Sequence, residues 1–151
     1  MNVNEKSTDW DPRASVGFWL NNASRTLLRL HDARLRELGL AMAQLPVLVA
    51  LQDGEALPQK ELAKRARIEQ PSMVELIARM ERAGLVRRAP HPDDGRVSLI
   101  SLTPRASKQL PKAKEALLQG EAEAMAGLSK AERTQLRELL MRVAQNLGAM
   151  D

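Results

Sequence analysis

LAKRARIEQPSMVELIARMERAGLVRRAPHPDDGRVSLISLT, the stretch from Leu62 to Thr103, decides the fold that this sequence predicts. It predicts a short amphipathic helix over 62–67 and a second helix over 70–83, which Gly84 ends. Two apolar runs follow, at 85–86 and 97–102, and a turn rich in Pro, Asp and Gly separates them. Helix, turn, helix and two-stranded ribbon outline a winged helix-turn-helix, in which the second helix enters the DNA major groove.

The second helix has two different faces. At 100° per residue, its large apolar side chains fall on one side, which we expect to be buried: Met73, Leu76, Ile77 and Met80. The opposite side carries Pro71, Ser72, Glu75, Ala78, Arg79 and Arg82. Pro71 near the start costs little, because N–H groups of the first turn have no partner within the helix. The polar side could be a binding surface or simply a solvent-exposed face. The ribbon that follows the helix favours the binding surface.

The ribbon carries arginines around a tight turn. Arg87 and Arg88 precede the loop, and Asp94–Gly95 is a strong turn signal. Arg96 lies just past the tip, where Asp93 or Asp94 can accept its hydrogen bonds or those of Arg88. An arginine on a narrow hairpin suits an electronegative minor groove. The alternative is an ordinary surface hairpin, whose ion pair contributes less than about 1 kcal/mol.

These segments resemble a known family. GLVRR and DDGRVSLISLT are similar to the wing of the MarR family of bacterial transcriptional regulators, marked by Asp-x-Arg and a strand ending in Leu-Thr. ELAKRARIEQPSMVELIARMERAGLV resembles the family's helix-turn-helix, and IEQPS is closest to its SlyA-like branch. The resemblance implies a mainly α fold with a small β-hairpin. Its parts would be an N-terminal tail (1–12), a winged helix-turn-helix (40–103), and flanking dimerisation helices (13–39 and 104–151).

Composition is consistent with one cytoplasmic domain that binds a polyanion. The 151 residues are 44% hydrophobic, and the net charge is +4. Between Leu57 and Arg105 there are ten Lys/Arg and six Asp/Glu, so the whole excess lies in the winged-helix segment. The absence of cysteine excludes disulfides and thiol redox sensing. Without a signal peptide or a run of 18 apolar residues, we expect no membrane partner.

Further helices are predicted on both sides of this segment. A long helix over 13–38 has an apolar stripe and ends at Gly39, and a second covers 43–52 with Pro46 near its start. Pro58 is expected as the first residue of the shorter DNA-reading helix. A helix over 105–125, kinked at Pro111, precedes a last helix capped by Ser129. The resemblance implies that the two final helices pair with the first helix of a second subunit; an intramolecular cap is the alternative.

No pattern indicates an enzyme, a metal site or a cofactor. His31 and His91 are the only histidines, and no histidine or carboxylate cluster has metal-ligand spacing. His31 is expected to be a hydrogen-bonded partner of a carboxylate. Asp93 and Asp94 are adjacent in a turn, which suits loop structure better than paired acid–base chemistry.

The resemblance implies that a homodimer places two copies of the second helix in successive major grooves of a pseudo-palindromic operator. The candidate DNA-binding residues are Gln59, Lys60, Gln70, Pro71, Ser72, Glu75, Arg79, Arg87, Arg88, Asp94 and Arg96. Glu75 stands where the SlyA-like branch has a basic residue; it can accept from cytosine or pair with Arg79. Gly95 replaces an arginine common in the wing motif. Weaker nonspecific affinity is therefore predicted.

Regulation by a small molecule is also implied by the resemblance, since many family members are released from DNA by aromatic acids or phenols. The candidate ligand-binding residues are Trp19, Asn22, Arg25 and Met42. As an alternative, Trp19 and Met42 are simply core residues. The leading hypothesis is a repressor relieved by such a ligand. The rival is a winged helix that binds proteins and has weak or lost DNA affinity, which Glu75 and the low net charge keep open.

Overall fold

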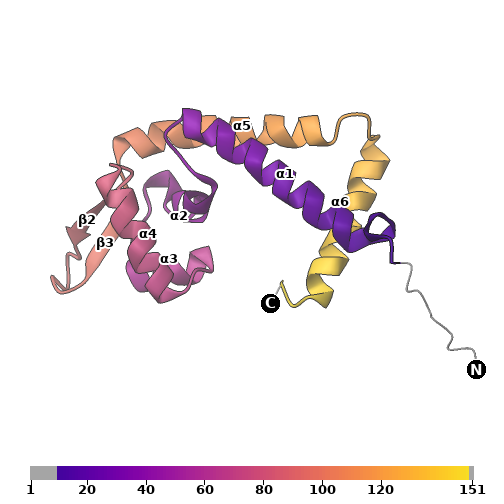
Figure 1. Ribbon diagram of the computed structural model, residues 1–151. Helices are drawn as coiled ribbons and strands as arrows, with labels where there is room; N and C mark the ends of the chain where they lie inside the picture. Colours follow the sequence, from indigo (N-terminus) through magenta and orange to yellow (C-terminus); the bar gives the residue numbers. More distant parts are fainter. Residues whose placement is uncertain (1–9, 150–151) are drawn as a thin grey trace, which may run out of the picture.

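The computed structural model describes residues 10–149 of the chain. Two long helices, α1 (Val16–Glu37) and α5 (Pro104–Ala124), cross and pack against each other, and the shorter elements cluster at one end of this pair (Figure 1). At the other end, the chain turns after α5 into α6 (Lys130–Asn146), which stands apart from the cluster (Figure 1). Most of the predicted N-terminal tail, residues 1–9, lies outside the described residues.

The cluster is a winged helix-turn-helix. It contains α2 (Leu45–Ala50), α3 (Gln59–Ala66) and α4 (Gln70–Arg82), with strands β1 (Ala56–Pro58), β2 (Val86–Pro90) and β3 (Ser98–Leu102). The described residues also form three short 3-10 helices: η1 (Pro12–Ala14), η2 (Met42–Gln44) and η3 (Gln52–Gly54). The expected fold class, mainly α with a small β element, is confirmed.

The sheet has three strands, not the two expected from sequence. It is antiparallel in the order β1-β3-β2, with Leu57 opposite Ile100 and Val86 opposite Leu102. Pro58 ends β1 and is the N-cap of α3, so its prediction as the first helical residue was wrong by one position. The strand escaped prediction because three residues ending in proline carry almost no strand signal, and proline is tolerated at a sheet edge.

The helix ends follow local chemistry. Gly39 and Gly84 both have a φ of +71°, which only glycine adopts without strain, and they end α1 and α4 as expected. The first helix begins later than predicted, at Val16, because Ser15 is extended and separates it from η1. The capping box of Ser129 and Glu132 is confirmed, with the two side chain–backbone hydrogen bonds at 3.2 and 2.7 Å. Pro111 removes one donor from α5 without ending it.

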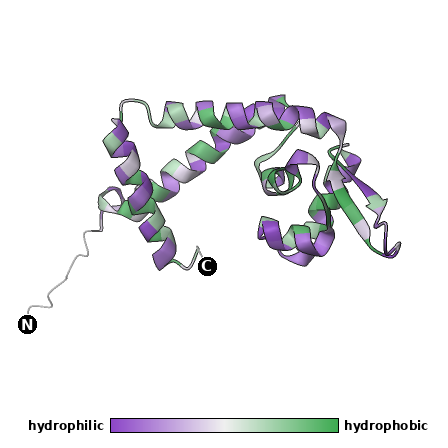
Figure 2. Ribbon diagram, turned by 180° about the vertical axis from the view of Figure 1, so that it is seen from behind, coloured by the Kyte–Doolittle hydropathy of each residue, from purple (hydrophilic) through white to green (hydrophobic). Residues whose placement is uncertain are grey.

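The buried core belongs mostly to the winged helix. Its fully buried large side chains are Leu35, Val47, Leu48, Leu51, Leu62, Met73, Ile77, Met80, Leu85 and Ile100. In contrast, α6, which the structure describes in full, has no buried residue although its sequence is amphipathic. Hydrophobic residues alternate with hydrophilic ones along α1, α5 and α6 (Figure 2).

Candidate nucleic-acid interface

Helix α4 presents one buried and one open face, as its periodicity predicted. Met73, Ile77 and Met80 are fully buried in the core. Among the candidate residues on this helix, all are exposed: Gln70, Pro71, Ser72, Glu75 and Arg79. At its start, no side chain caps the helix and Pro71 occupies the first turn, so the remaining N–H groups there stay available to a polar ligand.

The turn that leads into α4 is built on a strained residue. Arg67 ends α3 with a φ of +53°, a left-handed conformation that a residue with a Cβ adopts at some cost. The backbone hydrogen bond from Ile68 N to Ala63 O, at 3.0 Å, holds this turn. A shallow hollow beside it is lined by Lys60, Lys64 and Arg67 among others. Only Lys60 was a candidate from sequence; the helical period of α3 and the αL turn bring the other two cations beside it.

Helix α3 starts at the same edge. Gln59 is half-buried and Lys60 is exposed in its first turn. Glu61, Glu55 and Arg65 form ion pairs there at 3.2 and 3.8 Å, so Arg65 has acidic partners within its own subunit. The cations of this edge that have no ion-pair partner in residues 10–149 are Lys60, Lys64 and Arg67.

The wing holds its tip in one shape. Asp94 Oδ1 accepts from the backbone N of Arg96 at 3.1 Å and from its Nε at 3.2 Å, so the expected contact between these two residues is confirmed. The Arg96 side chain remains 93% exposed. At the base of the tip, His91 N donates to Val97 O at 2.8 Å. The hairpin therefore carries a guanidinium into solvent on a defined turn.

Arg88 has a different partner from the one considered in the sequence. Its Nε donates to Glu81 Oε2 on α4 at 2.7 Å, not to Asp93 or Asp94. Arg87 Nε donates to the Ser101 hydroxyl of the neighbouring strand at 3.4 Å. The Arg88–Glu81 pair joins β2 to the last turns of α4, so it positions the wing relative to that helix. The sequence signal was weak, because the two residues are seven apart and belong to different elements.

Glu75 has no ion-pair partner among residues 10–149. The i, i+4 pair with Arg79 that the spacing allowed is therefore not formed in this structure. Both side chains lie on the open face of α4, where solvation competes with a pair worth only a few tenths of a kcal/mol. The carboxylate remains free for a partner outside the chain.

The start of α5 holds the end of α4. Arg105 Nη1 donates to Ala83 O at 2.9 Å, and the Thr103 hydroxyl donates to Gly84 O at 2.6 Å while accepting from Ala106 N at 3.2 Å. These bonds satisfy carbonyl groups that a helix end leaves without partners. They connect α4 to the long helix behind it, a role of Arg105 that no local pattern indicated.

The structure does not bring the four candidate ligand-binding residues together within one subunit. Trp19 lies thirteen residues before Asp32 on α1, about 20 Å along the helix axis, and Met42 lies beside Asp32, whose Oδ1 accepts from the Met42 backbone N at 2.9 Å. Trp19 is 54% exposed and donates its indole N–H to Arg13 O at 2.8 Å, so its interpretation as a core residue is wrong. Asn22 is half-buried and Arg25 exposed, whereas Met42 packs against the hydrophobic core.

The prediction for His31 was also wrong. Its Nε2 is buried and has no hydrogen-bond partner, carboxylate or otherwise, within the described residues. The ring fits against α5 because Gly120 has no side chain; a Cβ there would lie 2.7 Å from His31 Cδ2. In the described part of the chain, no group of three or more His, Asp or Glu side chains could hold a metal ion. No described helix is long and apolar enough to cross a membrane.

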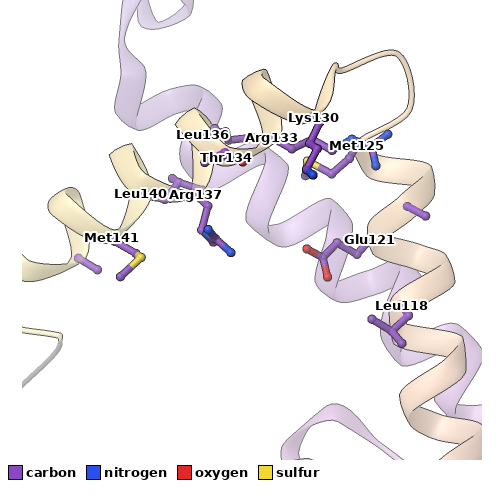
Figure 3. Close-up of a pocket in the computed structure, with 12 residues that line it drawn as sticks. Leu118, Glu121, Met125, Lys130, Arg133, Thr134, Leu136, Arg137, Leu140 and Met141 are labelled. Carbon is purple, nitrogen blue, oxygen red and sulfur yellow. The ribbon is translucent and has the colours of Figure 1, made fainter.

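A second open surface lies far from the winged helix. An apolar groove runs between the end of α5 and α6, and Leu118, Met125, Leu136, Leu140 and Met141 line it (Figure 3). Charged residues also line the groove, with Glu121 on the α5 side and Arg137 on the α6 side (Figure 3).

Comparison with known proteins places this arrangement among regulators. Residues 38–97 match a family model described as the MarR family. A helix-turn-helix-type transcriptional regulator of Mycobacterium tuberculosis is 37% identical over 97 residues, which cover 64% of this chain and 68% of that relative. A probable transcriptional regulator from Pseudomonas aeruginosa is 29% identical with a TM-score of 0.74, over 88% of this chain and 99% of the other. A mutant MarR from E. coli, complexed with operator DNA, shares the fold at 23% identity (TM-score 0.73; 85% and 92% covered).

Proposed function

The chain belongs to the MarR family of helix-turn-helix transcriptional regulators, and we propose that it binds a pseudo-palindromic DNA operator as a homodimer and represses transcription there. The main observation behind this proposal is that one small domain exposes both the open face of α4 and the arginine at the tip of the wing. The open face of α4 and the wing that carries the exposed Arg96 are joined through the Arg88–Glu81 ion pair. A major-groove helix and a minor-groove arginine need such a fixed relation.

The contacts divide by chemistry. Gln70, Ser72 and Arg79 are proposed to meet base edges or phosphates from α4, and Arg96 to enter the minor groove. Lys60, Lys64, Arg67 and Arg87 are proposed as phosphate contacts, and Gln59 lies beside Lys60 at the start of α3. Arg88 and Asp94 act indirectly, because each holds the wing through a contact inside the chain. The operator-bound E. coli relative supports this use of the fold.

The homodimer is supported by apolar surface that one chain leaves uncovered. Val16, Leu118, Leu139, Leu140, Met141 and Leu147 are all exposed, and they lie on α1, on α5, on α6 and at the C-cap of α6. Contiguous apolar surface of this kind marks an interaction site in a soluble protein. A two-fold pair would also repeat α4 at the spacing of one DNA turn, about 34–36 Å.

Release by a small aromatic acid or phenol completes the proposal. Since about 20 Å of α1 separates Trp19 from Asp32, the neighbour of Met42, a pocket that uses both Trp19 and Met42 would combine residues of two subunits. Trp19 is then a direct probe, because its ring is exposed in the single chain. Salicylate added to the Trp10→Phe variant, in which Trp19 is the only tryptophan, should quench the fluorescence of Trp19 and weaken operator binding together. If salicylate quenches the fluorescence but leaves operator affinity unchanged, the ligand binds without regulating DNA binding.

The deciding experiment is a titration with duplex containing an inverted repeat of about 20 base pairs, repeated over a salt series. A dimer that neutralises about eight phosphates, four per subunit, should give a log–log slope near −7. The rival function, a winged helix that binds another protein, is favoured by the unpaired Glu75 on the open face. A flat slope with weak affinity would support that rival and contradict the proposal.

A further inference from the structure

The first two turns of α4 have an unusual surface for a helix that meets DNA. Val74 is 50% exposed there, although the core beneath the helix is complete without it. Pro71, three residues before Val74, and Ala78, four residues after it, are its neighbours on the helix surface. Glu75 stands beside them without an ion-pair partner in residues 10–149. The exposed cations of this helix, Arg79 and Arg82, come later.

The wing fixes which side of α4 this surface occupies. Val74 and Glu81 are seven residues apart, so they lie on the same side of the helix. Glu81 binds Arg88 of β2 at 2.7 Å, which places β2 along that side. Val74 therefore lies between the centre of the open face and the wing. The Arg88 charge is paired with Glu81, and the residues of α4 on this side, Val74, Ala78 and Glu81, include no cation, so base edges suit this side better than phosphates.

The Val74 side chain and the Glu75 carboxylate each have a chemically matching partner in the major groove. An aliphatic side chain fits the thymine 5-methyl group, and a carboxylate accepts from the cytosine N4 amino group. Guanine offers only acceptors on that edge, so an ionised Glu75 opposes it. N-terminal residues of a helix-turn-helix recognition helix are the ones that reach base edges.

We infer that the first two turns of α4 read pyrimidines, with Val74 against a thymine methyl and Glu75 accepting from the amino group of a nearby cytosine. This inference rests on the proposed function, since it names the bases that the same surface selects. Val74 is then a specificity-determining residue. It was not among the candidates from sequence, because mainly polar and charged residues were considered as DNA contacts.

The test begins with the wild-type chain and a random duplex library at low salt. Each thymine of the selected half-site is then replaced by deoxyuridine, which lacks only the methyl group. We expect one position per half-site at which this replacement weakens binding about fourfold, the value of one buried methyl-sized group. In Val74→Ala, that discrimination should disappear, so that thymine and uracil duplexes bind equally.

Matched controls separate local from general effects. Val49→Ala removes an equally exposed valine on α2 and should keep the fourfold difference. Glu75→Gln should reduce a preference for cytosine over guanine from at least about fivefold toward none, whereas Glu115→Gln on α5 should leave it unchanged. Thermal melting of each variant checks that the fold is kept.

The possible outcomes distinguish a failure of base reading by Val74 and Glu75 from a failure of DNA binding itself. If no duplex is enriched and none binds at low salt, the proposed function fails. If duplexes are enriched but no thymine is sensitive to its methyl group, or Val74→Ala keeps the discrimination, the assignment of Val74 is overturned. If Glu75→Gln keeps the cytosine preference, the assignment of Glu75 is overturned while DNA binding stands.

Discussion

The winged-helix domain, from α2 to β3 (residues 45–102), buries most of its large apolar side chains, whereas α6 leaves most of its own exposed. In the domain, Leu48, Ile77, Met80 and Ile100 are fully enclosed by their own chain. In α6, Leu139, Leu140 and Met141 remain exposed, and nothing on that helix is buried. The difference teaches that the first region buries most of these side chains within one chain, whereas α6 leaves a hydrophobic face exposed, which the proposed dimer would cover. The following changes test that contrast, from the largest expected effect to the smallest.

Truncation inside the finished core should be the most damaging change. Leu48→Ala leaves a cavity among fully buried neighbours and should lower the free energy of unfolding by about 2–5 kcal/mol. Its neighbour Val49 is exposed, so Val49→Ala should change stability by less than about 0.5 kcal/mol. Urea unfolding followed by circular dichroism measures both. Equal effects of the two variants would mean that the domain is not closed as described.

A charge on α6 should separate assembly from folding. Leu140→Asp places a carboxylate in the groove between α5 and α6 and should weaken the dimer by at least about 100-fold, or roughly 3 kcal/mol. Analytical ultracentrifugation reports the dissociation constant, and circular dichroism should show the helical content kept. A variant that stays dimeric at low concentration would place the subunit contact elsewhere.

Removal of the wing cation should affect DNA binding alone. Arg96→Ala deletes a guanidinium that is 93% exposed and is held by Asp94. We expect affinity to fall about tenfold, and the salt slope to become shallower by about one per subunit. Fluorescence anisotropy over a salt series measures both, and Lys108→Ala on the exposed side of α5 is the control. An unchanged slope would remove Arg96 from the interface.

The smallest effect concerns the carboxylate on the recognition surface. Glu75→Arg replaces repulsion of nearby phosphates by attraction, so binding to random duplex should strengthen about threefold to tenfold. Because Glu75 has no ion-pair partner in residues 10–149, the change should leave stability almost unaltered. No gain in affinity for random duplex would mean that this face of α4 does not approach the backbone.

The sequence predicted the helices and the wing well because their signals are local. The apolar period of α4, the glycines at 39 and 84, and the Ser129 capping box each depend on residues a few positions apart. What it missed depends on chain segments meeting in space. Strand β1 exists through pairing with β3, and Arg88 chooses Glu81 because packing sets β2 beside α4. His31 is accommodated by Gly120, 89 positions away in the chain, on another helix.

In the candidate site, too, the features that depend on neighbouring residues could be predicted, and those that depend on distant chain segments could not. Exposed polar residues on α4 could be read from periodicity, and Asp94–Arg96 from a turn motif. Arg67 was passed over because its place beside Lys60 depends on the left-handed turn that ends α3, whereas Lys64, four residues after Lys60 on α3, could have been read from the helical period. The ligand candidates do not all come together within one chain, because Trp19 lies about 20 Å along α1 from Asp32, the neighbour of Met42, and their shared role stays a prediction.

One measurement tests the central claim that a pair of chains presents two recognition surfaces in fixed relation. The selected inverted repeat is compared with a version in which five base pairs are inserted between its halves, which turns one half-site to the opposite side of the duplex. We expect two chains per intact repeat and a loss of at least about 100-fold in affinity on insertion. Equal affinity for both duplexes, or one chain per repeat, would contradict the account.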